Sequence, residues 1–546
     1  MAGTYTYPGV YVEEIPSGVR TITGVSTSDT AFIDVFLRGP VNRAVRCTSY
    51  ADFERQFGGL DSRSEASYAI QQYYLNGGTF AWVIRVTNNA QTASRSLEDN
   101  PNYYASGASS GSPSGNSMTV NAANPGRWGN NVQVGVDYKG TRRAAGTDEP
   151  LEFNLAVREV VEVRGRKQVL SNEIYRNLSM DQTSPRYIQS VINDQSSLIN
   201  ITDISMGEVP KATGGDVIST IGDVNSVDFV PLGPTPGQPG GDGDAPTATE
   251  LIGSPSAKEG IYALDDIQPF IFNILCIPAL ARLEDEARAS VITAAKKYCL
   301  DNRAMFIIDI PEVTDTPAEM IALADDMHDD NDRNAAVYFP RLQIPDPLNE
   351  YRLRNVGPSG TLAGVYARTD AVRGVWKAPA GTDAGLQGAS PVVLLDDQKN
   401  GDLNQMGINV LRTFPIFGSI SWGARTLEGA DQQASEWKYI PVRRTALFIE
   451  ESLYQGLKWV VFEPNDEPLW SQIRLNVGAF MHDLFRRGAF QGATPKEAYF
   501  VKCDKDTTTQ NDIDHGIVNI LVGFAPLKPA EFVVIKIQQM AGQIQV

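Results

Sequence analysis

Both ends of the chain carry short apolar segments with the composition of β-strands. These residues are Val10, Tyr11, Val12 and Ile15 near the amino terminus, and Phe532, Val533, Val534, Ile535 and Ile537 near the carboxyl terminus. Chain ends are normally where order fades. A terminal strand with apolar side chains on both faces must find a sheet edge or become an aggregation hazard. The sequence therefore predicts two terminal arms that link this subunit to its neighbours.

Length and charge limit the class of protein. A chain of 546 residues is too long for one core and suggests three or four domains. Its net charge of −18 argues against a nucleic-acid coat or an anionic membrane surface, because both need clustered Lys and Arg. From residue 400 onward the chain has 14 basic and 16 acidic side chains, so this C-terminal region is nearly neutral.

The cysteines and the apolar segments indicate a cytosolic product. The four cysteines form no CxxC pair, and Cys276 and Cys299 lie in apolar or helical runs typical of buried free thiols. The start of the chain lacks a basic stretch and an apolar core, so we expect no secretory signal. The most apolar stretch, 270–281, contains Pro278 and is shorter than the roughly 20 residues of a membrane span.

An alternation of strands and helices predicts a parallel sheet covered by helices. Strands are expected over 30–36, 81–86, 270–277, 304–310 and 335–339, and helices over 50–57, 65–75, 283–300 and 317–328. Between the second and third of these strands, residues 88–265 are rich in Ser, Gly, Pro and Asp. The alternating runs 132–138 and 152–163 inside this region predict a small β-rich insertion.

Beyond residue 400 the pattern changes to long amphipathic helices, expected over 444–461 and 469–487, followed by strands near 498–503 and 516–523. We therefore predict a multidomain α/β protein with a parallel-sheet middle domain, a β-rich inserted domain, an α+β C-terminal domain and two extended strand arms. The predicted boundaries are an N-terminal arm over 1–24, an α/β domain over 25–89 and 263–395, an insertion over 90–262, a C-terminal domain over 396–522, and a C-terminal arm over 523–546 with a hinge at 523–528.

The sequence gives little support for catalysis. Its three histidines, His328, His482 and His515, lie beside no nucleophile motif. The G-x-S-x-G string at 107–111 is flanked by Ser and Gly, whereas a nucleophile elbow needs a strand before it and a helix after it. No phosphate-binding glycine motif is present. We predict no catalytic, metal or cofactor residues.

Two charged clusters can each be interpreted either as ordinary solvated side chains or as a binding site. The acidic run 325–332 could bind a divalent cation, but a solvated turn between a helix and a strand is favoured. The arginines of the C-terminal region could be ordinary solvated side chains, which is the favoured reading, or they could face a partner. They are Arg443, Arg444, Arg474, Arg486 and Arg487.

Several sequence blocks resemble the contractile-tail sheath proteins of bacteriophages and related injection machines. Their order and spacing along the whole chain make coincidence improbable, and only the insertion is poorly covered. The blocks lie at 7–15, 26–33, 124–130, 357–381, 407–412, 422–427, 442–444, 462–465 and 529–532.

The resemblance implies a structural subunit with no cofactor. Such subunits polymerise as stacked six-membered rings in a helical tube around an inner tail tube, and contract once to drive that tube through a cell envelope. The implied partners are further copies of the chain, the tail tube protein, and the baseplate and tail-terminator proteins, with no nucleic acid and no direct membrane anchoring. The implied location is the tail of a virion assembled in the host cytoplasm. A headless contractile bacteriocin fits equally well.

The resemblance also suggests roles for the two arms and for three arginines. The arms would add strands to the C-terminal domains of neighbouring subunits. Arg474, Arg486 and Arg487 are then candidates for facing the tube, because the region around them is nearly neutral in an otherwise acidic chain. Part of the family's α/β domain is described as subtilisin-like in fold, so a subtilisin-like hydrolase is the alternative from another class. An inner tube protein is a further alternative, but the size and the α/β pattern argue against it.

Overall fold

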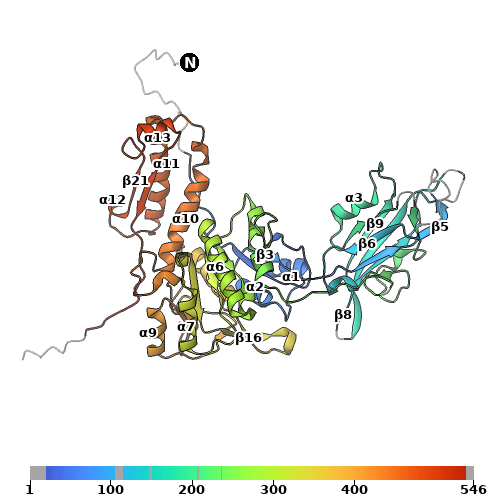
Figure 1. Ribbon diagram of the computed structural model, residues 1–546, viewed down its shortest axis with the longest axis horizontal. Helices are drawn as coiled ribbons and strands as arrows, with labels where there is room; N and C mark the ends of the chain where they lie inside the picture. Colours follow the sequence, from blue (N-terminus) through green and yellow to red (C-terminus); the bar gives the residue numbers. More distant parts are fainter. Residues whose placement is uncertain are drawn as a thin grey trace, which may run out of the picture.

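The structure is a computed structural model, and it describes residues 20–104, 115–144, 146, 150–163, 165–205, 208–234 and 236–536. Figure 1 shows a central body of helices and strands, a β-rich lobe joined to it by a narrow neck, and a helical domain on the other side of the body. The described chain begins at the helical domain, and the C-terminal arm leaves the body as an extended chain.

The body is built on one eight-stranded sheet. Along the sheet the strands are β2 (Ala44–Cys47), β3 (Ala81–Arg85), β1 (Thr30–Asp34), β13 (Ile274–Cys276), β14 (Met305–Ile308), β15 (Ala335–Phe339), β19 (Asn409–Phe414) and β20 (Gly418–Ser421). The six strands from β3 to β19 are parallel, and an antiparallel strand closes each edge. The parallel arrangement predicted from the alternating strands and helices is therefore confirmed.

Helices cover both faces of this sheet, which explains why its strands are apolar on both sides. One face carries α5 (Ala248–Ile252), the 3-10 helix η2 (Gly260–Ile267), α6 (Asp285–Asp301), α7 (Pro317–Met327) and α9 (Asp397–Gln405). The other face carries α1 (Tyr50–Phe57), α2 (Glu65–Leu75), α8 (Ser359–Arg373) and the start of α10 (Ile440–Gly456). A short antiparallel sheet of β16 (Leu342–Asp346), β17 (Arg352–Val356) and β18 (Ser390–Pro391) completes the body.

Small residues allow α2 and α8 to lie against each other. A Cβ added to Gly360 would lie 2.1 Å from the carbonyl oxygen of Ala69, and one added to Gly364 would lie 2.6 Å from that of Tyr73. Neither position has room for a side chain. This close approach gives a physical reason for the small residues in the block 357–381.

Within its described residues, the lobe has its own hydrophobic core and three antiparallel sheets. The sheets combine β4 (Ser94–Leu97) with β6 (Met118–Ala122) and β10 (Ile199–Thr202), β5 (Asp99–Tyr104) with β11 (Glu208–Pro210), and β7 (Val132–Asp137) with β8 (Phe153–Val163), β9 (Arg166–Leu178) and β12 (Val230–Pro231). Two helices, α3 (Ile188–Gln195) and α4 (Val217–Thr220), pack on these strands.

The neck consists of two antiparallel segments, 88–94 and 238–244, which run side by side. Gln91 and Gly241 exchange two backbone hydrogen bonds of 2.8 and 3.0 Å, and Ser94 and Gln238 exchange a second pair of 3.0 and 2.7 Å. Arg63 of the body contacts Asp242 at 2.8 Å. A hydrogen-bonded ladder therefore joins the lobe to the body.

The predicted end of the insertion at residue 262 is wrong. Residues Leu251, Ile261 and Leu264 on α5 and η2 are buried in the core of the central sheet. The chain thus returns to the body directly after the neck, near residue 244. The composition did not indicate this return of the chain to the body, because the buried residues of α5 and η2 are few and lie between Gly, Ser and Pro.

The predicted boundary at residue 396 is also wrong. Strands β19 and β20 extend the central sheet, and Leu403 of α9 lies in its core. The C-terminal core is formed instead by the second half of α10, α11 (Glu467–Arg486), α12 (Pro495–Ala498), β21 (Tyr499–Lys502), α13 (Gln510–Asp514) and β22 (Leu521–Phe524). Helix α10 joins the two parts, because Ile440 packs in the body and Ile449 in the C-terminal domain. No helix within the described ranges has the length and apolarity needed to cross a membrane.

Candidate subunit interfaces

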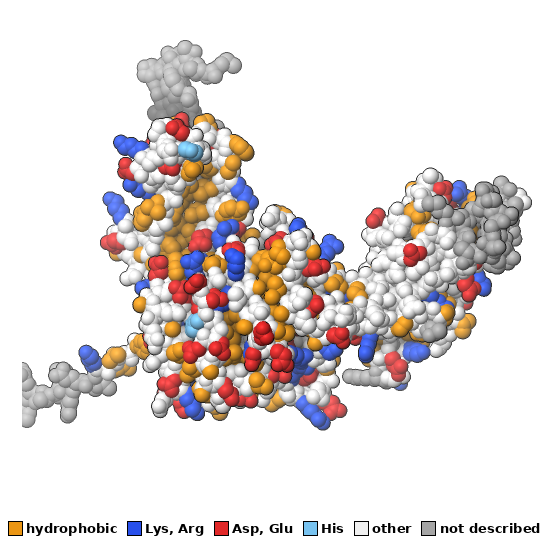
Figure 2. Space-filling model, in the orientation of Figure 1, with side chains coloured by type: hydrophobic (Ala, Val, Ile, Leu, Met, Phe, Trp, Pro, Cys, Tyr) orange, Lys and Arg blue, Asp and Glu red, His pale blue; other side chains and the backbone are white. Residues whose placement is uncertain are grey.

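The C-terminal arm exposes consecutive large apolar side chains. Phe532, Val533, Val534 and Ile535 are 77–80% exposed, and their backbone pairs with no strand in the described part of the chain. The arm can be followed away from the body in Figure 2, where hydrophobic side chains lie along it. Burying each of these side chains fully is worth about 1.5–3 kcal/mol. Ile537, which belongs to the same predicted strand, lies outside the described residues.

The N-terminal candidates Val10, Tyr11, Val12 and Ile15 also lie outside the described residues. The described chain begins at the C-terminal domain, where the Arg20 amide donates to Asn476 Oδ1 at 3.1 Å. The Arg20 guanidinium lies over the ring of Trp459 at 4.7 Å, and Ile22 is buried in the C-terminal core. The first residues that the structure describes are therefore held by the C-terminal domain.

The C-terminal domain presents a small sheet with unused edges. Strands β21 and β22 pair over four residues each, and within the described ranges each pairs with no other strand. The side chains of Phe500 on β21 and Leu521 on β22 are both 53% exposed. Two strands alone are marginally stable in water, and an exposed edge accepts a further strand by main-chain hydrogen bonding.

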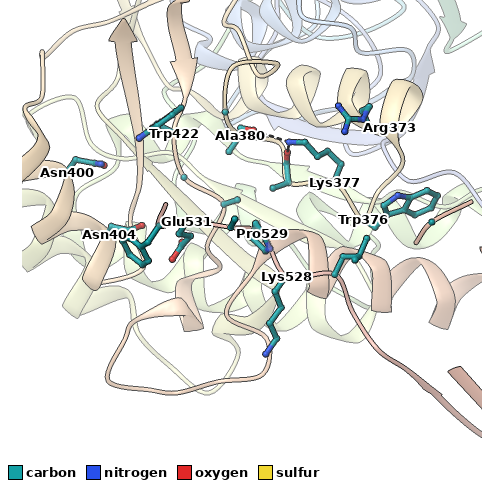
Figure 3. Close-up of a pocket in the computed structure, with 18 of the residues that line it drawn as sticks. Arg373, Trp376, Lys377, Ala380, Asn400, Asn404, Trp422, Lys528, Pro529 and Glu531 are labelled. Atoms are coloured by element: carbon teal, nitrogen blue, oxygen red, sulfur yellow. Dashed lines mark hydrogen bonds between the residues drawn. The ribbon is translucent and has the colours of Figure 1, made fainter. Parts of the chain in front are cut away.

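A groove of about 720 Å³ separates the start of the C-terminal arm from the body. In Figure 3, Trp422 and Asn404 lie on one side of it and Trp376 and Arg373 on the other, with the chain of Pro529 and Glu531 between them. Its charged lining is mainly basic and comprises Arg373, Lys377, Arg487, Lys528 and Glu531. Partial burial lowers the pKa of Lys377, whose Nζ donates to the carbonyl oxygens of Ala378 at 2.8 Å and Ala380 at 3.2 Å.

Glu531 is held by a buried arginine. The Nε and Nη2 groups of Arg425 donate to the two carboxylate oxygens of Glu531 at 2.8 and 2.6 Å. The side chain of Arg425 is 1% exposed. Although burial opposes it, the contact with Glu531 raises the pKa of Arg425 above its usual range. The hydroxyl of Tyr439 also donates to Glu531 at 3.3 Å.

Sequence reasoning missed this pair, although it identified both of the blocks that contain it. Arg425 and Glu531 are 106 residues apart in the sequence, and neither residue has a spacing or a neighbour that points to the other. Their association depends on how the C-terminal domain folds back onto the body. Covariation between the two positions in an alignment of relatives is the signal that could have found it.

The three candidate arginines lie on α11 or at its C-cap, and the structure gives them different surroundings. Arg486 and Arg487 end α11, and the Arg487 guanidinium lies 5.4 Å from the ring of Trp376. Arg474 lies on an earlier turn of the same helix and contacts Glu467 at 2.5 Å. It also donates to the carbonyl oxygen of Cys503.

Both interpretations of Arg443 and Arg444 are wrong, because these side chains are neither solvated nor facing a partner. They are 4% and 3% exposed. Arg444 donates to both carboxylate oxygens of Asp370 on α8 at 2.9 and 2.6 Å. Arg443 Nε donates to Asn334 Oδ1 at 2.7 Å. The two arginines fasten α10 to the body.

The acidic run 325–332 is not simply a solvated turn. Lys296, which is fully buried, lies between Asp329 at 2.9 Å and Asp332 at 2.7 Å. His328 Nδ1 lies 2.6 Å from the other oxygen of Asp332. Burial of Asp332 opposes ionisation, but the contacts with His328 and Lys296 outweigh it and lower its pKa. In the described part of the chain, no group of three or more His, Cys, Asp and Glu has an arrangement that could hold a metal ion.

The other two histidines have equally local contacts. His482 Nδ1 lies 3.2 Å from the hydroxyl of Tyr499, and His515 Nδ1 lies 2.7 Å from the carbonyl oxygen of Asn511. These contacts are internal to the C-terminal domain. The string at 107–111 lies outside the described residues.

A smaller cavity of about 310 Å³ lies where β1 and β3 end, the edge at which open parallel sheets usually bind ligands. Here the space is bordered by the neck, and two of its carboxylates, Glu65 and Asp242, are paired with arginines of the same chain. Glu65, with 1% of its side chain exposed, contacts Arg282 at 2.6 Å, Arg354 at 3.0 Å and Arg341 at 3.4 Å. Burial raises the pKa of the adjacent Asp34 to about 7, against hydrogen bonds that favour its ionised form.

Comparison with known proteins connects this architecture with one class. Residues 432–540 match the family described as the phage tail sheath C-terminal domain. A putative prophage major tail sheath protein of Pseudomonas aeruginosa is 27% identical over 296 residues, which is 52% of this chain and 70% of that protein. The tail sheath protein of Vibrio phage KVP40 is 30% identical over 188 residues, which is 34% of this chain and 26% of that protein.

Solved structures share the fold over almost the whole chain. The sheath of an extracellular contractile injection system, in the contracted state, has 20% identity and a TM-score of 0.55 over 98% of this chain and 99% of that one. A sheath tail protein of Listeria innocua has 12% identity and a TM-score of 0.56 over 93% and 96%. The helical sheath of the anti-feeding prophage, also contracted, has 21% identity and a TM-score of 0.54 over 98% and 100%.

The chain is similar to contractile tail sheath proteins of phages and related injection systems, and its residues 432–540 match the C-terminal domain of that family. It is a structural subunit of a contractile sheath and not an enzyme. The subtilisin-like alternative is therefore excluded as a function.

Proposed function

We propose that the chain polymerises as stacked six-membered rings in a helical sheath around a tail tube, and that this sheath contracts to drive the tube through a cell envelope. The observation that carries the proposal is the complementarity of two features on one chain. One is an extended arm with Phe532–Ile535 exposed, and the other is the two-stranded sheet of β21 and β22 with open edges.

The exposed arm and the open edges of β21 and β22 can each be paired on a neighbouring copy of the chain. The arm leaves the body without a partner strand, so its apolar residues need a surface on another molecule. The edges of β21 and β22 offer main-chain donors and acceptors, and the exposed Phe500 and Leu521 offer apolar contact. Each copy would supply an arm to one neighbour and receive an arm from another. Such head-to-tail contacts build an open helical assembly.

The N-terminal arm, with Val10, Tyr11, Val12 and Ile15, is proposed to link subunits in the same way. Its attachment to the C-terminal domain through Arg20 and Ile22 supports this, because the domain that carries the sheet of β21 and β22 also holds the start of the described chain. Further proposed partners are the tube, the baseplate and a tail terminator, in a particle assembled in the host cytoplasm.

We propose that the lobe at 88–244 lies on the outside of the sheath and that the C-terminal domain faces the tube. Arg486 and Arg487 are the proposed tube contacts, because Arg486 is exposed and Arg487 keeps 57% of its side chain accessible. The internal contacts of Arg474 favour a structural role for that residue. A reconstruction of the sheath on its tube that places Arg486 and Arg487 away from the tube would remove them from this contact.

Truncation tests the linking role of the arms. Deletion of residues 1–15, or of residues 532–546, should leave a folded subunit that no longer forms tubes. The deleted residues contribute to a neighbour's sheet and little to the local core. Circular dichroism and size-exclusion chromatography report the fold, and negative-stain electron microscopy reports assembly.

Deletion of residues 542–546 is the matched control, because it shortens the chain beyond the apolar run, and it should assemble as the full chain does. Tubes of normal length and abundance from either arm deletion would contradict the proposal.

A further inference from the structure

The C-terminal arm does not become free where the sequence suggested a hinge, at 523–528. Directly after β22, the amide of Ala525 donates to the carbonyl oxygen of Ala498 at 2.8 Å, and the amide of Gln491 donates to that of Ala525 at 2.9 Å. Pro526 forms a bridge with Phe490. The chain up to residue 526 thus belongs to the C-terminal domain.

Five residues later, at Glu531, the chain is held again, this time by the body. Glu531 accepts two hydrogen bonds from Arg425, at 2.8 and 2.6 Å, in a planar two-pronged contact. The exposed fraction of the side chains changes at this point, since Glu531 is half-buried and Phe532 is 77% exposed. The free part of the arm begins at Phe532.

Arg425 is itself tied to the central sheet. Its amide donates to Asn409 Oδ1 on β19 at 2.7 Å, and Asn409 Nδ2 donates to the carbonyl oxygens of Arg425 at 2.7 Å and Val337 on β15 at 3.1 Å. A force on Glu531 therefore reaches two neighbouring strands of the body through Arg425 and Asn409. The C-terminal domain is not part of this path.

We infer that the ion pair of Glu531 with Arg425 is the anchor of the C-terminal arm. It fixes the point and direction at which the arm leaves the body, and it passes the load between subunits into the central sheet. Glu531 is a positioning residue, since the strand contacts themselves belong to Phe532–Ile535. The inference rests on the proposed function, because an arm that links no neighbour carries no load.

The remaining contacts of Arg425 make the anchor testable without unfolding the body. Its Nη1 also donates to the carbonyl oxygen of Asn404 at 2.7 Å and to Asp431 Oδ1 at 3.0 Å. Replacing Glu531 therefore leaves Arg425 with a carboxylate and a carbonyl. Asp431→Ala is the matched control, because it removes the other carboxylate from the same arginine and does not touch the arm.

The first measurement is made on unassembled subunits and reports the position of the arm. Spin labels on Val534→Cys and on the exposed Asp402→Cys of α9 give the distance from arm to body by double electron-electron resonance. All four native cysteines are buried, which directs the labels to the introduced sites. The distance distribution should be narrow in the parent and in Asp431→Ala, and should broaden at least twofold in Glu531→Ala and Glu531→Gln.

The second measurement is the yield of sedimentable tubes, which should fall at least tenfold in Glu531→Ala and remain near the parent level in Asp431→Ala. A Glu531→Gln variant with an unchanged distance distribution and normal tube yield would overturn the anchor. The deletion of 532–546 separates the two claims. If that deletion still assembles, the linking role of the arm fails and the load-bearing part of the inference fails with it, while the distance measurement still decides whether Glu531 positions the arm.

Discussion

Buried ion pairs connect several helices and strands of this protein. Glu65 is surrounded by three arginines, Arg444 is paired with Asp370 across α10 and α8, and Lys296 is held between two aspartates. Removing one partner of such a pair leaves an uncompensated buried charge and typically costs about 3–5 kcal/mol. These contacts fix α2, α8 and α10 relative to the sheet.

Asp34 gives the subunit a pH-dependent stability. Burial raises its pKa to about 7 in the folded chain, compared with 3.8 for an exposed carboxyl. The folded state therefore keeps a proton that the unfolded state releases between about pH 4 and pH 7. Its contribution to stability is fully present below about pH 4 and is lost as pH rises through 7.

We expect Asp34→Asn to reduce the loss of unfolding free energy between pH 5 and pH 8 by about 3 kcal/mol, since the loss extends over the two pH units from 5 to 7 and each pKa unit corresponds to about 1.4 kcal/mol. Melting curves of the subunit at both pH values measure this change. Asp402→Asn on exposed α9 is the control and should leave the pH profile unchanged. An identical profile for Asp34→Asn and the parent would show that Asp34 does not titrate in this range.

At the residue scale, sequence patterns identified the exposed apolar arm residues but misjudged the arginines. Phe532–Ile535 were predictable because four adjacent apolar residues near a chain end have few alternative explanations. Arg443 and Arg444 were not, because a buried arginine and a solvated one look alike in a single sequence. Only the positions of Asp370 and Asn334 in the fold distinguish the two cases.

At the scale of elements, hydrophobic periodicity located the strands and helices of the body. The expected helices over 283–300 and 317–328 correspond to α6 and α7, and the expected strand over 304–310 to β14. Domain boundaries were harder to predict from the sequence, because β19 and β20 join the central sheet after some 70 residues of other structure. Strand pairing over that separation depends on the tertiary fold, which a local pattern does not contain.

The neck defines the two positions at which the lobe can be removed from the body, which the composition alone did not show. Replacing residues 89–243 by a short Gly-Ser linker should leave the body folded, because Asn88 and Asp244 are neighbours in the neck and the lobe has its own core. Replacing 90–262 should give an insoluble chain. That deletion removes Leu251, Ile261 and Leu264, each worth about 1.5–3 kcal/mol of burial.

Soluble expression and circular dichroism compare the two deletions, and electron microscopy tests whether the first still polymerises, as an outward-facing lobe requires. Two equally soluble proteins would mean that α5 and η2 are dispensable to the body. A folded 89–243 replacement that forms no tubes would contradict the outward placement of the lobe.

At the scale of the whole molecule, internal contacts hold the C-terminal domain on the body. The C-terminal arm and the edges of the small sheet, in contrast, have no strand partner within the described residues. Helix α10, the pair Arg444 and Asp370, and the chain from Arg20 onward hold the C-terminal domain on the body. The apolar arm residues and the edges of β21 and β22 remain unpaired in the described chain. Contraction would then be a rearrangement between subunits, with the arms as the lasting links.

The most direct test of this account is a cryo-electron microscopy reconstruction of tubes assembled from the full chain. We predict helical order with six subunits per ring, and density in which Phe532–Ile535 of one subunit continues the sheet of β21 and β22 in a neighbour. An arm that folds back onto its own chain, or tubes in which the edges of β21 and β22 stay empty, would contradict the account.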